Sequence, residues 1–321
     1  MVERRTVIKG ISAAAITAAT SAISMRQVQA QQAPNSVGTA PPKLKVPANA
    51  CDCHHHIYDP ARFPMAPTKG RAAPANGTVA DYRLLQKRIG TTRSVVVQPR
   101  NYAVANEVTL DALALAGGNS RGVAVVHPTI TDADLKKFND AGVRGIRFSL
   151  GDPANAVVKV DMIEPLAKRI ANLGWHIQFN VDGKQVVELA ELLRRLPTPL
   201  VFDHLAHPPL PDGIEHLSHT IVRGLIDKGR TWVKLSGAYS NSKIGPPNYP
   251  EATKIAQAFV KAAPERLVWG SDWPHPGLPD NNKPDDALLL DLLSVWAPDE
   301  KIRNRILVQN PETLYGFPKT A

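Results

Sequence analysis

The sequence CDCHHHIYD, residues 51–59, opens the folded part of this chain with a short buried strand that ends in polar side chains. Seven more runs rich in Val, Ile and Trp follow, and stretches with apolar residues three and four positions apart separate them. These runs cover residues 94–98, 122–126, 143–148, 175–180, 200–204, 231–236 and 266–272. Eight strands that alternate with helices predict a single closed (β/α)8 TIM-type barrel, an α/β fold. An open doubly wound sheet is the alternative, but no glycine-rich phosphate loop follows the first run.

The first strand also raises the question of which side chains converge. Successive side chains of an extended strand face opposite ways, so we expect Asp52, His54 and His56 on one face. Cys51 and Cys53 would then lie on the other face, toward the helices. Two imidazoles that point at one atom above the strand end are a common way to bind zinc or polarise a carbonyl. No second Cys or His pair follows at the spacing of a zinc finger.

Residues 1–30 have the layout of a twin-arginine export signal, with Arg4 and Arg5 ahead of an alanine-rich apolar run and a small-residue exit. An amphipathic N-terminal helix is the alternative. The run is too short and too weakly apolar to serve as a membrane anchor. We therefore expect passage through the twin-arginine export machinery, a periplasmic or secreted bacterial protein, and no membrane insertion after signal removal. Residues 31–49 should form an irregular tail, and residues 50–321 the barrel domain.

Composition and charge indicate which classes of partner this protein can bind. The chain has 321 residues, of which 43% are hydrophobic and 21% charged, and a formal net charge of +9. Lys and Arg are scattered among acidic residues without a basic run or interleaved aromatic residues, which disfavours nucleic-acid binding. The net positive charge favours a small anionic substrate instead. Only two cysteines occur, so no disulfide framework is available.

In a (β/α)8 barrel the functional groups gather at the carboxyl ends of the strands. Asp272 follows the eighth strand between a small-residue turn and a Trp-Pro pair, where it could act as a general base, although a helix N-cap is the alternative. His204 ends the sixth strand and could complete a ring with His54 and His56. Asp203 is expected to point the other way.

Four motifs together resemble the amidohydrolase superfamily. They are DCHHH at the first strand, GIRF at the fourth, DHLAHP at the sixth and WGSDWPHP at the eighth, with NPETLYGF near the end of the chain. The likeness runs from about residue 50 to residue 317. It is closest to the lactone-processing branch, which includes 2-pyrone-4,6-dicarboxylate lactonase, 4-sulfomuconolactone hydrolase, sugar-acid lactonases and D-galactarolactone isomerase.

The resemblance implies a hydrolase that opens a small acidic lactone. Asp272 would act as the base for water, and three histidines would surround the carbonyl. Members of this branch differ over metal, so metal-free catalysis and a single zinc ion both remain open. The implied catalytic residues, which would also be the ligands of a divalent metal, are His54, His56, His204 and Asp272.

Substrate contacts follow from the same comparison and from the loops. Arg147 would match an arginine that holds a substrate carboxylate, and Arg100 could supply a second cation. Further Arg and Tyr anchors of the dicarboxylate enzymes are absent from the corresponding loops. Asn180 and Tyr239 would offer neutral hydrogen bonds instead, which suits a hydroxylated or singly charged substrate. His275 is the remaining candidate for substrate binding.

Three other functions compete with hydrolysis. A lactone isomerase or a decarboxylase of the same superfamily would use the same groups. A periplasmic small-molecule binding protein without turnover is a further alternative, but a carboxylate beside histidines usually has chemical work to do. A serine hydrolase is disfavoured because no G-x-S-x-G elbow occurs.

Overall fold

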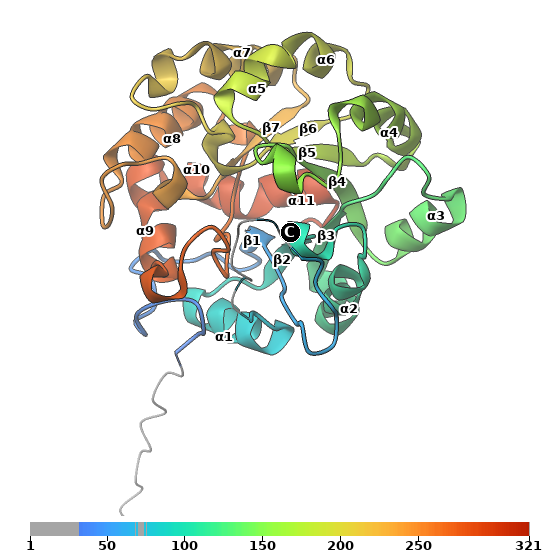
Figure 1. The fold of residues 1–321 in the computed structure, drawn as a ribbon. Helices are drawn as coiled ribbons and strands as arrows, with labels where there is room; N and C mark the ends of the chain where they lie inside the picture. The colour runs from blue at the N-terminus through green and yellow to red at the C-terminus, as the bar shows by residue number, and fades with distance from the viewer. Residues whose placement is uncertain (1–31, 68, 70–73, 75, 321) are drawn as a thin grey trace, which may run out of the picture.

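The computed structural model describes residues 32–67, 69, 74 and 76–320 and shows eight parallel strands in chain order around a barrel (Figure 1). Each strand pairs in parallel with the next one. The strands are β1 (Cys51–His55), β2 (Arg93–Val97), β3 (Ser120–Ala124), β4 (Val143–Ser149), β5 (His176–Asn180), β6 (Leu200–Phe202), β7 (Thr231–Leu235) and β8 (Leu267–Trp269). The predicted (β/α)8 barrel is confirmed.

Helices surround the strands on the outside of the barrel (Figure 1). They are α1 (Val79–Ile89), α2 (Glu107–Ala116), α3 (Asp132–Asp140), α4 (Ile163–Ile170), α5 (Gly183–Glu188), α6 (Ala190–Arg195), α7 (Leu217–Asp227), α8 (Pro250–Ala262), α9 (Asp286–Trp296), α10 (Glu300–Asn304) and α11 (Asn310–Tyr315). Local signals set the ends of α1: Thr78 and Asp81 form a capping box, and Gly90 ends the helix with φ of 79°. None of the helices in the described residues is long and apolar enough to cross a membrane.

The barrel closes just beyond β8. A parallel bridge joins His55 to Trp273. The N–H of Asp272 donates to the carbonyl of His54 at 2.7 Å, and the N–H of His56 donates to the carbonyl of Trp273 at 2.8 Å. The seam of the barrel therefore coincides with the residues expected to carry the chemistry.

Strands β6 and β8 end two and three residues earlier than the sequence predicts. Residues 200–204 and 266–272 were expected as strands, but β6 stops at Phe202 and β8 at Trp269. The reason is backbone conformation, because His204 has φ of 48° and Asp272 has φ of 64°, values that a strand does not contain. These left-handed turns direct both side chains back over the barrel.

The expected alternation in the first strand is wrong. Pairing with β2 shifts register between Asp52 and His55, which marks a bulge. Cys51 and Cys53 lie with barrel-facing side chains of other strands, such as Val95 and Val201, and not toward the helices. The bulge then lets His54 face the interior as well.

The side chains on the outer side of β1 contact α1. Asp52 accepts a 3.0 Å hydrogen bond from the hydroxyl of Tyr82, and the ring of His55 stacks on the Tyr82 ring with centroids 3.5 Å apart. Asp52 also accepts from the hydroxyl of Ser271 at 2.6 Å. Asp52 therefore holds the turn before Asp272 instead of joining the imidazoles.

Residues 32–49 contain no helix or strand and pack against the barrel wall. Ala33 and Ser36 are buried there. The indole N–H of Trp273 donates to the carbonyl of Pro34 at 2.7 Å, and the N–H of Asp286 donates to the hydroxyl of Ser36 at 3.2 Å. This segment lies directly behind the loop that carries Asp272. The expected export signal, residues 1–30, lies outside the described residues.

Candidate active site

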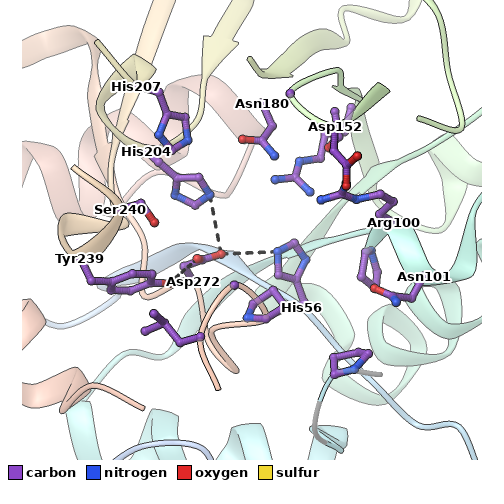
Figure 2. Close-up of a pocket in the computed structure, with 18 of the residues that line it drawn as sticks. His56, Arg100, Asn101, Asp152, Asn180, His204, His207, Tyr239, Ser240 and Asp272 are labelled. Carbon is purple, nitrogen blue, oxygen red and sulfur yellow. Dashed lines mark hydrogen bonds and ion pairs between the residues drawn. The ribbon is translucent and has the colours of Figure 1, made fainter. Parts of the chain in front are cut away.

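A cavity of about 780 Å³ opens at the carboxyl ends of the strands (Figure 2). Every strand except β3 contributes to its wall through its last residues or the loop that follows. The polar side chains that line it include His56, Tyr58, Arg100, Asn101, Arg147, Asp152, Asn180, His204, His207, Tyr239, Ser240 and Asp272. A cavity of this size can enclose a small ligand.

Asp272 lies among three imidazoles, as predicted. Its Oδ1 is 3.4 Å from His54 Nε2, 3.5 Å from His56 Nε2 and 3.7 Å from His204 Nε2. In Figure 2, dashed lines join Asp272 to both His56 and His204. His54 lies beneath them, fully buried. Residues far apart in the sequence therefore meet at one carboxylate oxygen.

The environment keeps Asp272 ionised. Burial raises the pKa of its carboxyl, but the neighbouring imidazoles of His204, His56 and His54 outweigh burial and hold that pKa well below its usual value. Burial lowers the pKa of His204. An ionised carboxylate beside imidazoles can accept a proton from water.

A polar layer supports His54 from below. His54 Nδ1 is 3.1 Å from Asp203 Oδ1 and 3.2 Å from Lys234 Nζ. Lys234 donates to Gln178 Oε1 at 2.7 Å, and Arg147 donates to Asp203 Oδ2 at 3.0 Å. These contacts fix the ring plane of His54, so that Nε2 faces Asp272.

Charge balance decides the ionisation of that layer. Burial raises the pKa of Asp203, yet His54, Arg147 and Lys234 together hold it well below its usual value. Burial lowers the pKa of Lys234 to about 8, against the pull of Asp203. Burial and the Lys234 ammonium lower the pKa of His54. The layer therefore holds a carboxylate between two cations and a neutral imidazole.

The expectation that Asp203 points away from the site is wrong. It faces the barrel interior because it continues the alternation of Val201 and Phe202 along β6, and the left-handed turn at His204 then brings the His204 ring to the same side. Sequence analysis also missed Lys234 and Gln178. A signal for Lys234 was present: a lysine inside the apolar run TWVKL must be paired if the run is buried.

The candidate substrate contacts fall into two groups. Arg147, Arg100, Asn180 and Tyr239 line the cavity. Arg100 donates to Asp152 Oδ2 at 2.9 Å, so its charge is balanced at the mouth. His275 does not line the cavity. It is fully buried behind Tyr239, and its Nδ1 contacts the Tyr239 hydroxyl.

The donor set fits a single metal ion. His54, His56 and Asp272 each offer one atom to a common point, and His54, Asp203 and His204 form a second such group. Ligand atoms around a tetrahedral zinc with bonds of about 2.0–2.1 Å lie roughly 3.3–3.4 Å apart. In the first group the two Nε2 atoms are 3.3 Å apart, and their distances to Asp272 Oδ1 are 3.4 and 3.5 Å. That group already has the spacing of metal ligands.

Comparison with known proteins agrees with this geometry. The model of the amidohydrolase family matches residues 51–317. A 2-pyrone-4,6-dicarboxylate hydrolase of Comamonas testosteroni is 34% identical, and the match covers 85% of this chain and 92% of that protein. A D-galactarolactone isomerase of Agrobacterium fabrum is 31% identical, with coverage of 87% and 94%. A solved structure from Agrobacterium tumefaciens aligns with a TM-score of 0.80 at 29% identity, over 89% of this chain and 99% of that one. This chain therefore belongs to the amidohydrolase family.

Proposed function

We propose that this protein hydrolyses a small acidic lactone, such as a muconolactone-type, sulfonated or sugar-acid lactone. The observation that carries the proposal is the ionised Asp272 beside three imidazoles in the wall of a cavity that also contains Arg147. The names of the relatives support a lactone as substrate. One of them is named as an isomerase, so lactone isomerisation is the second candidate.

Asp272 would take one proton from water as the water oxygen attacks the lactone carbonyl carbon. The ring C–O bond then breaks, and the same proton passes to the departing alkoxide, so the product is an open-chain hydroxy acid. His204 lines the cavity beside Asp272 and can donate a hydrogen bond to the developing oxyanion. His56 donates from Nδ1 to the carbonyl of Val97 at 2.7 Å, so its Nε2 can serve as a metal ligand. Arg147 would bind the substrate carboxylate.

A single divalent ion is part of the proposal, and His54, His56 and Asp272 would hold it, with His204 beside them. Their nitrogen-rich donor set favours zinc, which would supply Lewis acidity at the carbonyl. Metal analysis of the purified protein tests this point: about one zinc per chain is expected, and a protein that works at full rate without metal would refute it.

Product analysis tests the reaction. Purified protein is incubated with sugar-acid, muconate-type and pyrone lactones in weakly buffered indicator. Hydrolysis releases about one proton per turnover and yields the open-chain acid, whereas an isomerase returns a lactone without net acid. Binding without either product would instead identify a binding protein.

We also propose export of the folded protein through the twin-arginine machinery to the periplasm. The support is the Arg4–Arg5 pair ahead of the apolar run. Cell fractionation of the native chain and of an Arg4→Lys, Arg5→Lys variant tests it. Retention of only the variant in the cytoplasm is expected.

A further inference from the structure

A line of polar contacts runs from Asp272 away from the cavity into the protein. Tyr239, in the loop after β7, donates its hydroxyl proton to Asp272 Oδ2. The same hydroxyl oxygen is 3.2 Å from His275 Nδ1, and His275 Nε2 is 3.2 Å from Asp286 Oδ2. His275 and Asp286 are both fully buried. The line therefore starts at the proposed base and ends at a second carboxylate that substrate does not reach.

The two oxygens of Asp272 have different surroundings. Oδ1 faces the imidazoles, and Oδ2 faces Tyr239. The Tyr239 hydroxyl carries one proton, which it donates to Oδ2. Tyr239 therefore has one proton and two neighbours that can accept it, Asp272 and the Nδ1 of His275.

Asp286 decides whether Nδ1 is an acceptor. A carboxylate at Nε2 favours the tautomer with its proton on Nε2, which leaves the lone pair on Nδ1. Asp286 begins helix α9, where the N-terminus of the helix favours a carboxylate. The ammonium of Lys283 donates to the backbone carbonyl of His275 at 3.0 Å and holds the loop in place. The ring is thus fixed in orientation and tautomer.

We propose that His275 and Asp286 are positioning residues that give the Tyr239 hydroxyl a second acceptor, so that its hydrogen bond follows the charge on Asp272 during turnover. This inference rests on the proposed function of Asp272 as a base. While Asp272 is ionised, Tyr239 donates to Oδ2. When Asp272 has taken the proton from water, its charge is lost, and the O–H of Tyr239 rotates toward His275 Nδ1. No O–H bond of Tyr239 breaks, and the proton on Asp272 still leaves with the alkoxide.

A double-mutant cycle distinguishes two roles of His275. In one, His275 acts on kcat through Tyr239, and in the other it supports the fold independently of Tyr239. His275→Leu removes the second acceptor, whereas His275→Asn keeps an amide oxygen near the place of Nδ1. We expect His275→Leu to lower kcat about 2- to 10-fold, the loss of one hydrogen bond between neutral groups. His275→Asn should recover most of that loss, and KM should change less than about threefold in both, because His275 does not line the cavity.

Tyr239→Phe completes the cycle. If His275 acts through Tyr239, adding His275→Leu to Tyr239→Phe lowers kcat no further. Additive losses would overturn the proposal. Asp285→Asn is the matched control, because it removes a charge one residue away, at the cap of α9 and beside Arg88, without touching His275. It should lower the melting temperature and leave kcat unchanged.

Nitrogen-15 NMR of histidine-labelled protein tests the tautomer independently of activity, with His275→Asn used to assign the signal. We expect the native His275 to carry its proton on Nε2. A proton on Nδ1 in the native protein would overturn the proposal even if lactone hydrolysis is confirmed. If no lactone is turned over, the proposed function fails, while the NMR result still decides the tautomer.

Discussion

The backbone N–H of Asp272 donates a 2.7 Å hydrogen bond to the carbonyl of His54. This contact closes the barrel between its first and last strands, and the same two residues also meet through their side chains at 3.4 Å. The same two residues therefore close the barrel and form the centre of the candidate active site. Substitutions that disturb the backbone contact between β1 and the Asp272 loop should lower both stability and kcat. Substitutions that change only the carboxylate of Asp272 should lower kcat and leave stability nearly unchanged.

Asp272→Asn tests that separation. The amide keeps the size and the backbone contact but cannot take a proton, so we expect kcat to fall by about 10³-fold or more. Calorimetry should show that ligand affinity changes less than tenfold. Asp299→Asn, at the N-cap of α10, removes one carboxylate outside the site and serves as the control. An Asp272→Asn enzyme that retains full activity would show that another group is the base.

Arg147→Gln tests recognition of the acid group. Arg147 lines the cavity, and its Nε donates to Asp203 Oδ2 at 3.0 Å. Loss of a hydrogen bond between charged groups should raise KM for a carboxylated lactone about 10- to 100-fold. KM for an uncharged lactone of similar size should stay within about twofold. Equal effects on both substrates would mean that Arg147 supports the fold and does not bind the acid.

Much of this site could be predicted because strand-end positions in a barrel converge. The cluster of His54, His56, His204 and Asp272 followed from eight apolar runs and the polar residue after each. What could not be predicted depended on departures from regular strand geometry. A bulge in β1 turned Cys51 into the barrel, and no residue type in CDCHHH marks that bulge.

The supporting residues were hidden for a different reason. Lys234, Gln178 and Asp286 act through other side chains, and their pairing depends on distances between strands that a sequence does not contain. Of the three, only Lys234 could be recognised from the sequence, because it is a charged residue within an apolar run. Side chains that meet substrate are thus easier to find than those that hold them in place.

Lys234→Met should reveal the cost of the buried charge layer. Removing the ammonium leaves Asp203 buried with fewer partners, and breaking such a pair costs about 3–5 kcal/mol. We expect a loss of that order in the free energy of unfolding in urea at pH 7. A change below about 1 kcal/mol would show that Arg147 and Gln178 alone satisfy Asp203.

Ionisation of Lys234 should also make the free energy of unfolding depend on pH. Its pKa is about 8 in the folded chain and about 10.4 in an unfolded one. Between these values the unfolded state binds more protons, so this group makes the folded state more stable as pH rises from about 8 to 10. Urea unfolding at pH 7.5 and pH 9.5 measures the change, and the difference between the two pH values should be smaller or absent in Lys234→Met.

Deletion of residues 32–38 tests whether the segment behind the site belongs to the working enzyme. It removes the Pro34 carbonyl that accepts from the Trp273 indole and the Ser36 hydroxyl that accepts from the Asp286 N–H. Two buried donors are left unpaired, each at about 1–3 kcal/mol, so the free energy of unfolding should fall by about 2–6 kcal/mol. Because Trp273 follows Asp272 directly, kcat should also fall about tenfold.

The matched control for that deletion is Asn35→Ala. Asn35 lies in the same segment and bonds the exposed carbonyl of Asn76, at 2.7 Å, so its loss should cost less than about 1 kcal/mol. Ser36→Ala removes the hydroxyl that accepts from the Asp286 N–H and from Arg88 Nη1, and it should give an intermediate result. If the deletion lowers stability but kcat stays unchanged, the segment only covers the barrel wall and does not hold the Asp272 loop.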